Sequence, residues 1–323
     1  MEAPLIALTG ASGFVGRHLL EDLRAYGFRV RVLLRRPIDQ MLTADSALIG
    51  DLAQPSNLSR ALEGVDAIVH SAGIAHAASG LPEMDYRTIN TDATLRLAEA
   101  GARAGAKRFV FLSSVRAQSG PSAEGVLDES RPPEPTDAYG RSKLAAEEGL
   151  AGLGIDCVSL RPVLVYGPGV KGNMAALLRL AKSPHPLPFA GLKARRSLLA
   201  VENLAEAVRW SLSHPMRLSG AYLVADDTPL TLPEMLRAMR SGLGRPPRLW
   251  PVPEFLFGAG AWLAGRTEIL ERLAGNLVVD CRALKRLGWR PRIASVEGLA
   301  SLARSSGETD RTDNDAIAPE TSA

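Results

Sequence analysis

Tyr139 and Lys143 stand four residues apart in the segment Tyr139-Gly140-Arg141-Ser142-Lys143, at the start of a stretch with helical character. On a helix, side chains at that spacing emerge on one face, one turn apart. A phenol has an ordinary pKa of about 10, so it is a poor base at neutral pH until a nearby cation favours its ionised form. A lysine one turn away can supply that charge. The pair therefore predicts proton transfer to or from a hydroxyl group, the step that accompanies hydride transfer at a carbinol carbon.

Two hydroxyl side chains, Ser113 and Ser114, follow the apolar run 109–112, which has the composition of a buried strand. Serines at strand ends commonly only form turns, and Tyr139 with Lys143 could also be an exposed pair on an ordinary amphipathic helix. A hydroxyl beside a reacting oxygen, however, can hydrogen-bond it and stabilise developing negative charge. Because all these residues follow a glycine turn and a series of strands, we expect Ser114, Tyr139 and Lys143 to be catalytic.

A glycine-rich turn lies near the N-terminus, where an apolar strand ends in Gly-x-x-Gly-x-x-Gly and enters a helix. Gly10 permits the tight turn, Gly13 lets the backbone approach a pyrophosphate, and Gly16 lets the helix pack on the strand, while the helix N-terminus offers free N–H groups. In a chain with 30 glycines the spacing alone is weak evidence, and the strand before it and the helix after it carry the prediction. The expected dinucleotide contacts from this turn are Gly10, Ser12, Gly13, Phe14, Val15 and Gly16.

The end of the second strand bears on the choice between NAD and NADP. A carboxylate there accepts hydrogen bonds from the ribose of NAD, whereas arginine suits the extra phosphate of NADP. Arg35 and Arg36 stand at this place, with no carboxylate before Asp39, which favours NADP(H) over NAD(H). Two ordinary surface arginines are the alternative. Further cofactor contacts are expected where the third and fourth strands end, at Asp51, Leu52, Ser71, Ala72 and Gly73.

Short apolar runs alternate with helical stretches through the first half of the chain, which is typical of βαβ units and a parallel sheet. The expected strands are 5–8, 29–34, 47–49, 67–70, 108–112, 156–160 and 221–224. The expected helices include 16–26, 57–63, 90–104 and 201–212. The fold class is therefore α/β: a doubly wound parallel sheet of the Rossmann type with a smaller, mostly helical substrate lobe. Residues 304–323 are polar and are expected to be a disordered tail.

Composition excludes several other classes of protein. The net charge of the 323 residues is only +3, and no basic run is interleaved with aromatic side chains, so no nucleic-acid partner is expected. The apolar stretch 255–264 has about half of the length that a membrane span needs, and a helix in the second lobe is the expected structure. Two cysteines and an N-terminus without a leader pattern favour the cytoplasm. The five histidines show no ligand spacing, so no metal site is expected.

Taken together, the glycine turn, Ser114, Tyr139 and Lys143 resemble the extended short-chain dehydrogenase/reductase family, and within it the NAD-dependent epimerase/dehydratase branch. The resemblance implies a Rossmann domain with about seven strands, formed by residues 1–167 and 200–224. It implies a substrate lobe formed by residues 168–199 and 225–303. A homodimer is implied as well, because many relatives pair through a four-helix bundle.

Four further residues take their expected roles from this resemblance. Asn90 opens an Asn-x-x-x-Thr pattern, and Pro162 matches the proline that borders the nicotinamide in the family. Asn173 and Arg196 match positions that contact the nucleotide diphosphate. The resemblance therefore implies that Asn90 and Pro162 contact the cofactor, and that Asn173 and Arg196, together with Ser114, bind a nucleotide-sugar substrate.

The chain departs from parts of this branch. Dehydratases carry Thr-Asp-Glu where this chain has Ser114-Val115-Arg116, so the acid/base pair that eliminates water is missing. Many epimerases carry an acidic residue in place of Arg35, and a Val-Tyr-Gly segment where this chain has residues 117–120. These departures argue against a 4,6-dehydratase and weaken the match to an ordinary UDP-glucose 4-epimerase.

The resemblance most directly implies a 4-keto-sugar reductase of surface-polysaccharide synthesis. NADPH would deliver hydride to C4 of the sugar while Tyr139 protonates the oxygen, Lys143 holds the nicotinamide ribose and Ser114 hydrogen-bonds the reacting oxygen. A UDP-sugar 4-epimerase with tightly bound NAD would use the same residues and is the main alternative. A non-catalytic NAD(P)-binding sensor is a minor one, since such proteins tend to lose the tyrosine or the lysine and this chain has both.

Overall fold

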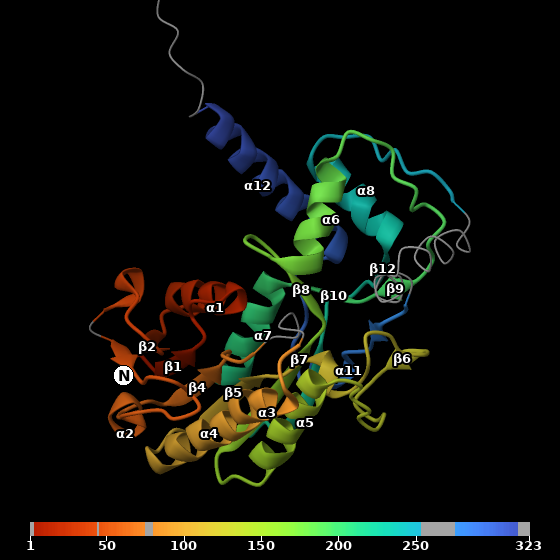
Figure 1. Cartoon of the computed structure of the whole chain (residues 1–323). Helices are drawn as coiled ribbons and strands as arrows, with labels where there is room; N and C mark the ends of the chain where they lie inside the picture. Colours follow the sequence, from red (N-terminus) through yellow and green to blue (C-terminus); the bar gives the residue numbers. More distant parts are fainter. Residues whose placement is uncertain (1–2, 44, 75–79, 253–274, 316–323) are drawn as a thin grey trace, which may run out of the picture.

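A parallel seven-stranded sheet forms the centre of the computed structural model, which describes residues 3–43, 45–74, 80–252 and 275–315 (Figure 1). The strand order is β3-β2-β1-β4-β5-β7-β11, and every neighbouring pair is parallel. Its strands are β1 (Leu5–Thr9), β2 (Arg29–Leu34), β3 (Ser46–Leu48), β4 (Ala67–His70), β5 (Arg108–Leu112), β7 (Asp156–Pro162) and β11 (Gly220–Val224). The order reverses between β1 and β4, where doubly wound sheets bind ligands. The predicted fold class is confirmed.

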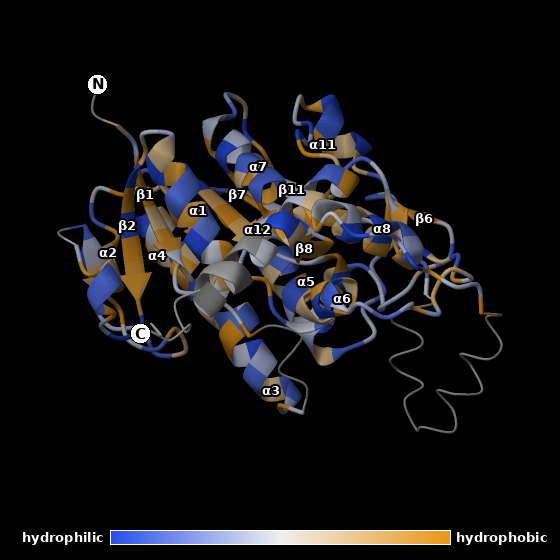
Figure 2. Ribbon diagram, turned by 90° about the horizontal axis from the view of Figure 1, so that it is seen from above, coloured by the Kyte–Doolittle hydropathy of each residue, from blue (hydrophilic) through white to orange (hydrophobic). Residues whose placement is uncertain are grey.

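Helices cover both faces of the sheet, and β1 shows how the two cores divide. Ile6 and Leu8 point into the core that includes α1 and α7, whereas Leu5 and Ala7 point into the core on the opposite face, which includes α2, α4 and α5. This alternation follows from the two-residue period of a strand. The helices around the sheet are α1 (Phe14–Ala25), α2 (Leu58–Ala61), α4 (Ala93–Arg103), α5 (Ala138–Ala151) and α7 (Val201–Ser213). Figure 2 shows apolar strands such as β1 and β2 beside helices with both apolar and polar surfaces.

A second group of helices forms the lobe at the top of Figure 1. It consists of α6 (Gly172–Lys182), α8 (Leu232–Gly242) and α12 (Ser295–Asp315), which share an apolar core that includes Leu177, Leu236 and Leu302. Short strands accompany these helices in three pairs: β8 (Leu164–Tyr166) with β10 (Leu198–Ala200), β9 (Arg195–Arg196) with β12 (Leu230–Thr231), and β6 (Val126–Leu127) with β13 (Val278–Val279). Helix α11 (Arg282–Arg286) packs near β11.

Asp226, just beyond β11, ties the lobe to the sheet. Its carboxylate accepts hydrogen bonds from the Tyr166 hydroxyl at 3.0 Å, the Asn203 side chain at 2.7 Å and the Ser295 hydroxyl at 2.9 Å. These donors lie at the end of β8, in α7 and at the start of α12. One buried carboxylate with three side-chain donors thus fixes the beginning of the last helix against the sheet.

The predicted strands agree closely with the structure. Residues 29–34, 67–70 and 108–112 have the expected bounds, and the sixth large strand continues two residues beyond the expected end, to Pro162. The predicted helix 90–104 is instead composite: α3 (Glu83–Tyr86) leads into a π-helical turn, η2 (Arg87–Asp92), and then α4. The apolar stretch 255–264, with its expected helix, lies outside the described residues.

The predicted disordered tail is wrong for residues 304–315, because α12 continues through them to Asp315. Contacts with the lobe hold the first part of this stretch. Lys182 donates a hydrogen bond to the Ser306 carbonyl at 3.0 Å, and Gly307 lies against the Leu243 side chain. Composition alone indicated a polar segment, whereas a helix already packed through Leu299 and Leu302 needs no nucleation to extend. Residues 316–323 lie outside the described residues.

Candidate active site

The glycine turn lies at the carboxyl end of β1, and two of its glycines are required by close packing. Gly10 has a φ of +75°, and a Cβ there would stand 2.7 Å from the Ala72 nitrogen. A Cβ on Gly16 would stand 2.0 Å from the Gly10 carbonyl oxygen. Gly13 is exposed and lies at the N-cap of α1 in an extended conformation, so the turn is open to solvent at that point. Any side chain at position 10 or 16 would displace the turn from β4 or from its own helix.

The first turn of α1 presents Phe14, Val15 and Gly16 to the space beyond β1, and Ser12 is exposed beside it. The leading N–H groups of a helix have no partner within the helix and carry its positive dipole end. The second loop that borders this turn is 167–168, where a Cβ on Gly167 would lie 3.8 Å from the Phe14 ring and where Pro168 accepts a hydrogen bond from His18 at 2.9 Å. A cradle without side chains at a helix N-terminus fits a pyrophosphate.

The residues expected to meet the adenosine end of a dinucleotide lie along the same edge of the sheet. Arg35 and Arg36 are exposed directly after β2. Asp51 is exposed after β3 and accepts a hydrogen bond from the Ala53 backbone at 2.8 Å, while Leu52 is half-buried. The arginines are therefore free of the core and stand at the carboxyl edge, in a position to face a ribose or its phosphate.

Asn90 joins the loop after β4 to helix α5. Its side-chain oxygen accepts a hydrogen bond from the Ile74 backbone at 2.8 Å, and its nitrogen donates to the Ile74 carbonyl at 3.1 Å and to the Ser142 hydroxyl at 3.0 Å. Gly73 lies against this amide, since a Cβ there would stand 2.8 Å from Asn90 Oδ1 and 3.5 Å from Lys143 Nζ. Asn90 sits in the π-helical turn η2, a feature common at functional sites. The structure thus brings together Gly73, Asn90 and Lys143, which the sequence assigned separately to the site.

His70, at the end of β4, extends this network to the glycine turn. Its Nδ1 lies 2.7 Å from the Thr9 hydroxyl, and its Nε2 lies 3.0 Å from the Thr94 hydroxyl. Thr94 already donates its proton to the Asn90 carbonyl, so we assign Nε2 as the protonated nitrogen that donates to Thr94, and Nδ1 as an acceptor from Thr9. Burial, with a smaller effect of the Lys143 charge, lowers the pKa of His70 to about 3. His70 is a neutral link in the core.

The start of helix α5 is held against the loop that follows β5. Asp137 caps the helix by accepting a hydrogen bond from the Gly140 backbone at 2.7 Å, and it also forms an ion pair with Arg116. Gly140 packs on that loop so closely that a Cβ would stand 2.2 Å from the Arg116 carbonyl oxygen. Ser114 caps the short 3-10 turn η3 (Val115–Ala117) by accepting from the Arg116 backbone. These contacts fix Ser114 beside the first turn of α5.

Tyr139 lies in that first turn, and its side chain is hydrogen-bonded to that of Ser114. Burial raises the pKa of Tyr139, and the Ser114 hydrogen bond and the Arg116 charge oppose this effect only in part. The phenol is therefore protonated at neutral pH. In the protein without cofactor desolvation is the largest effect on this phenol, and tuning of Tyr139 by Lys143 remains a prediction for the cofactor-bound enzyme.

Lys143 is buried one turn further along α5. Its Nζ donates a hydrogen bond to the Leu112 carbonyl at 2.9 Å and lies 4.5 Å from the centre of the Phe111 ring. Burial lowers the pKa of Lys143 to about 8, while the Glu147 carboxylate one turn further along the helix favours the charged form. The amine thus stands between the end of β5 and the loop at Gly73, which is the centre of the carboxyl edge of the sheet.

A buried polar network supports these residues from behind, and only its Ser113 was noticed in the sequence. Ser113 donates to Glu147, which also accepts from Arg161 Nε at 3.0 Å, and Arg161 Nη1 donates to the Gln118 side chain at 3.0 Å. A carboxylate four residues after Lys143 was the available sequence signal for Glu147. Arg161 on β7, the ion-pair partner of Glu147, could not be inferred from spacing.

The residues expected to bind substrate are distributed around this centre. Arg196 is half-buried in β9 and donates to the carbonyls of Gly275 at 2.8 Å and Pro121 at 2.7 Å. Burial lowers the pKa of Arg196, and the Arg116 charge adds a smaller effect in the same direction. The two guanidinium groups therefore repel each other electrostatically. Pro162 is buried at the end of β7, and its contact with a nicotinamide remains a prediction. Asn173 is exposed in the first turn of α6, within the lobe.

Other kinds of site lack support in the part of the chain that the structure describes. No three metal-ligating side chains gather there, and no helix there is long and apolar enough to cross a bilayer. Cys157 and Cys281 are free thiols, and burial raises the pKa of each to about 12. Neither thiol is therefore a nucleophile at neutral pH.

The fold and site define a Rossmann-type, dinucleotide-binding class of protein, and comparison with known proteins identifies the family. The model of the NAD dependent epimerase/dehydratase family matches residues 6–225. UDP-glucose 4-epimerase of Vibrio cholerae is 33% identical over 318 residues, which cover 93% of this chain and 94% of that protein. The chain belongs to the NAD-dependent epimerase/dehydratase family, and it is an enzyme of that family.

Solved structures agree with this assignment. MoeE5 in complex with UDP-glucose and NAD superimposes with a TM-score of 0.73 at 27% identity, covering 94% of this chain and 99% of that chain. UDP-glucose 4-epimerase of Thermus thermophilus in complex with NAD gives a TM-score of 0.71 at 26% identity, with the same coverage of 94% and 99%. The resemblance to extended short-chain dehydrogenases/reductases is thereby confirmed.

Proposed function

We propose that this enzyme exchanges hydride and proton at C4 of a nucleotide sugar, and that it inverts that carbon as a UDP-sugar 4-epimerase. The observation that carries the proposal is the group at the start of α5, where Tyr139 is hydrogen-bonded to Ser114 and Lys143 lies one turn away. The relationship to UDP-glucose 4-epimerases supports inversion. This reverses the order favoured by the sequence, which put a 4-keto-sugar reductase first.

The protein's own groups handle the proton and position the sugar. A bound nicotinamide would accept the hydride from C4 and return it. Tyr139 takes the proton of the 4-hydroxyl as the carbon is oxidised and gives it back on reduction, while Ser114 hydrogen-bonds the same oxygen. Lys143 would hold the ribose of a bound nicotinamide cofactor, and in that complex its charge would favour the ionised phenol. Glu147 favours the charged form of that lysine and so opposes the effect of burial.

The binding residues follow from the same arrangement. Gly10 to Gly16 and the first turn of α1 would hold the pyrophosphate of a bound dinucleotide. Ser71, Ala72, Gly73, Asn90 and Pro162 would contact its nicotinamide half. Arg196 and Asn173 hold the diphosphate of the nucleotide sugar. The enzyme lacks the carboxylates that a dehydratase of the branch carries, since Val115 and Arg116 stand at those positions.

A 4-keto-sugar reductase is the second candidate, and two observations favour it. Arg35 and Arg36 are exposed at the ribose end of the site, which suits NADP(H), the cofactor of biosynthetic reduction. Tyr139 is protonated in the protein without cofactor, as a proton donor to a ketone must be. In this version the same residues act once, and the reduced cofactor is consumed with each turnover.

The fate of the cofactor distinguishes the two candidates. We expect the purified enzyme to retain a dinucleotide, which mass spectrometry identifies as NAD or NADP, and to convert UDP-glucose into UDP-galactose without added cofactor. Turnover should leave absorbance at 340 nm unchanged. Stoichiometric loss of added NADPH with a 4-keto-sugar nucleotide, and no inversion of UDP-sugars, would instead establish the reductase. The cytoplasmic location, the homodimer and the two-part division of the chain remain predictions. Light scattering tests whether the protein is a dimer.

A further inference from the structure

We propose that Arg116 binds a carboxylate on the sugar, so that the preferred substrate is a nucleotide sugar of the uronic acid class. This inference rests on the proposed function, because it takes the sugar ring to lie at Ser114 and Tyr139. It goes further in naming the substituent of the ring and the residue that selects it. Arg116 stands two residues after Ser114 and is buried beside the catalytic group.

The guanidinium of Arg116 has donors to spare. Only 12% of its side chain is exposed, and its Nη2 pairs with Asp137. Its Nε and Nη1 are buried, yet neither has a hydrogen-bond partner among the residues that the structure describes. Buried N–H groups of a charged side chain are costly to leave unpaired. An acceptor supplied by a ligand removes that cost. Among the described residues Arg240 and Trp289 each leave one buried nitrogen without a partner, whereas Arg116 leaves two.

The backbone around Arg116 is fixed, so its side chain cannot easily leave this place. Its N–H is bonded to Ser114 Oγ at 3.2 Å, and its carbonyl is packed against Gly140 at the start of α5. Its charge opposes the rise in the pKa of Tyr139 and contributes to the lowered pKa of Arg196. Arg116 is therefore close enough to act electrostatically on both the reacting phenol and the arginine assigned to the diphosphate.

The charges at this place call for a further anion. Asp137 is the ion-pair partner of Arg116 among the described residues, and its carboxylate is also bonded to the Gly140 backbone. The diphosphate is assigned to Arg196, so Arg116 remains for another group of the substrate. In a hexuronic acid, C5 next to the reacting C4 carries the carboxylate. A planar guanidinium donates several hydrogen bonds to a carboxylate and fits it better than a hydroxymethyl group.

A purely structural role for Arg116 is the competing explanation. In that case the pair with Asp137 only steadies the cap of α5. Such a role uses Nη2 and leaves the buried Nε and Nη1 unexplained. It also predicts equal effects of any substitution on all substrates, whereas carboxylate binding predicts an effect that depends on the substrate.

The test compares binding of UDP-glucuronic acid, UDP-glucose and UDP to the NAD-loaded enzyme by calorimetry. We expect the wild type to bind UDP-glucuronic acid about 10- to 100-fold more tightly than UDP-glucose, the range of a charged hydrogen-bonded pair. Arg116→Gln should abolish that difference, and Arg116→Lys should restore part of it. Arg195→Gln is the matched control, because it removes the same charge from an exposed neighbour of Arg196 and should keep the preference.

The outcomes separate this inference from the proposed function. If the wild type binds UDP-glucose as tightly as UDP-glucuronic acid, the role of Arg116 is refuted while the nucleotide-sugar function stands. Equal weakening of both ligands by Arg116→Gln likewise assigns Arg116 to structure alone. If UDP and both UDP-sugars fail to bind while NAD binds, the proposed function itself is overturned, and the inference with it. The wild-type comparison decides the question even if a variant does not fold.

Discussion

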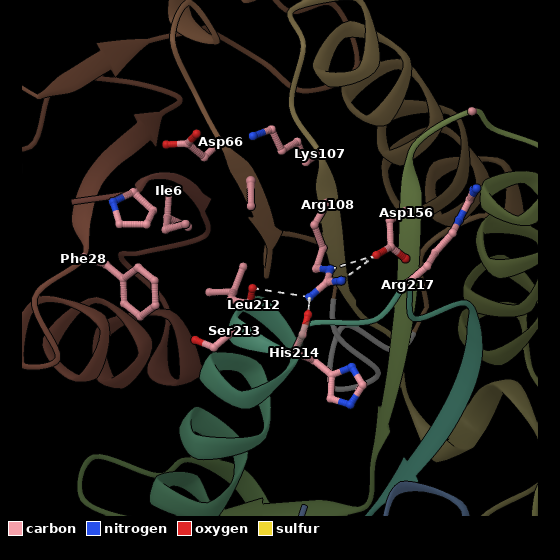
Figure 3. Close-up of a pocket in the computed structure, with 13 residues that line it drawn as sticks. Ile6, Phe28, Asp66, Lys107, Arg108, Asp156, Leu212, Ser213, His214 and Arg217 are labelled. Atoms are coloured by element: carbon pink, nitrogen blue, oxygen red, sulfur yellow. Dashed lines mark hydrogen bonds and ion pairs between the residues drawn. The ribbon is translucent and has the colours of Figure 1, made fainter. Parts of the chain in front are cut away.

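Arg108 and Arg116 lie at opposite edges of the sheet and are almost equally buried, with 11% and 12% of their side chains exposed. Arg108, at the amino end of β5, donates to Asp156 at 2.9 and 2.7 Å and to the His214 carbonyl at 2.8 Å (Figure 3). It also donates to the Ser211 carbonyl at 2.6 Å. Arg116, beyond the carboxyl end of the same strand, has only Asp137 as an ion-pair partner among the described residues. The first arginine is saturated by the fold, and the second is not.

The pocket beside Arg108 shows why this difference matters more than the size of a cavity. It has a volume of about 600 Å³ and is lined by polar side chains that include Asp66, Lys107 and Arg217. Its central guanidinium, however, caps the end of α7, where the last carbonyls of a helix need donors. At the carboxyl edge, Tyr139 and Lys143 instead have shifted pKa values. Arg116 there has two buried donors without a partner among the described residues. Burial alone therefore does not mark a functional charge in this protein.

The largest expected effect is at the carboxyl edge. Tyr139→Phe should lower kcat by about 10²- to 10⁴-fold, because it removes the proton donor and acceptor while leaving the ring in place. NAD binding and the midpoint of thermal unfolding should change little. The measurement is turnover of UDP-sugar, with cofactor content as the control. A variant with an undiminished rate would remove Tyr139 from the mechanism.

The next effect is at the amino edge and should appear in stability instead of activity. Arg108→Met removes the donors to Asp156 and to the end of α7, and should lower the free energy of unfolding by about 3 kcal/mol, as loss of one partner of a buried pair does. Urea unfolding measures this loss. The kcat of the folded fraction should match the wild type, and a kcat that falls with stability unaffected would contradict the assignment of this pocket to structure.

The smallest effect tests the core link between the two halves of the site. The pKa of His70 is about 3 when folded and about 6.5 when unfolded, so the unfolded state binds the extra proton as pH falls. Stability from this group is complete above pH 6.5 and should decrease by roughly 2 kcal/mol between pH 6.5 and pH 5. His70→Gln, which cannot titrate, should flatten this part of the pH profile of the unfolding midpoint. An unchanged profile would show that His70 is not buried and neutral.

The sequence by itself determined the sheet and supplied the residues that we propose as the reacting groups. The runs at 29–34, 67–70 and 108–112 are short, largely apolar and separated by helical patterns. Near-continuous apolar runs are typical of strands that are buried on both faces of a sheet. Gly10 and Gly16 were identifiable from the sequence because the need for glycine there is local. Gly10 forms the turn after β1, and Gly16 lets α1 pack closely on that turn. Tyr139 and Lys143 are one turn apart, so spacing alone placed them on one face.

Tertiary structure alone decided which charges are paired and how burial shifts the pKa values. The hydrogen bonds of Arg108 depend on Ser211, and the ion pair of Arg116 depends on Asp137. Each partner is distant in sequence from its arginine, so local spacing does not reveal either contact. The pKa of Tyr139 is raised by desolvation, which no spacing reveals. The helix that continues through 304–315 likewise begins in a part of α12 that packs on the lobe through Leu299 and Leu302. Local pattern determines elements, because backbone geometry is local, whereas electrostatic balance depends on every group that folding brings within reach.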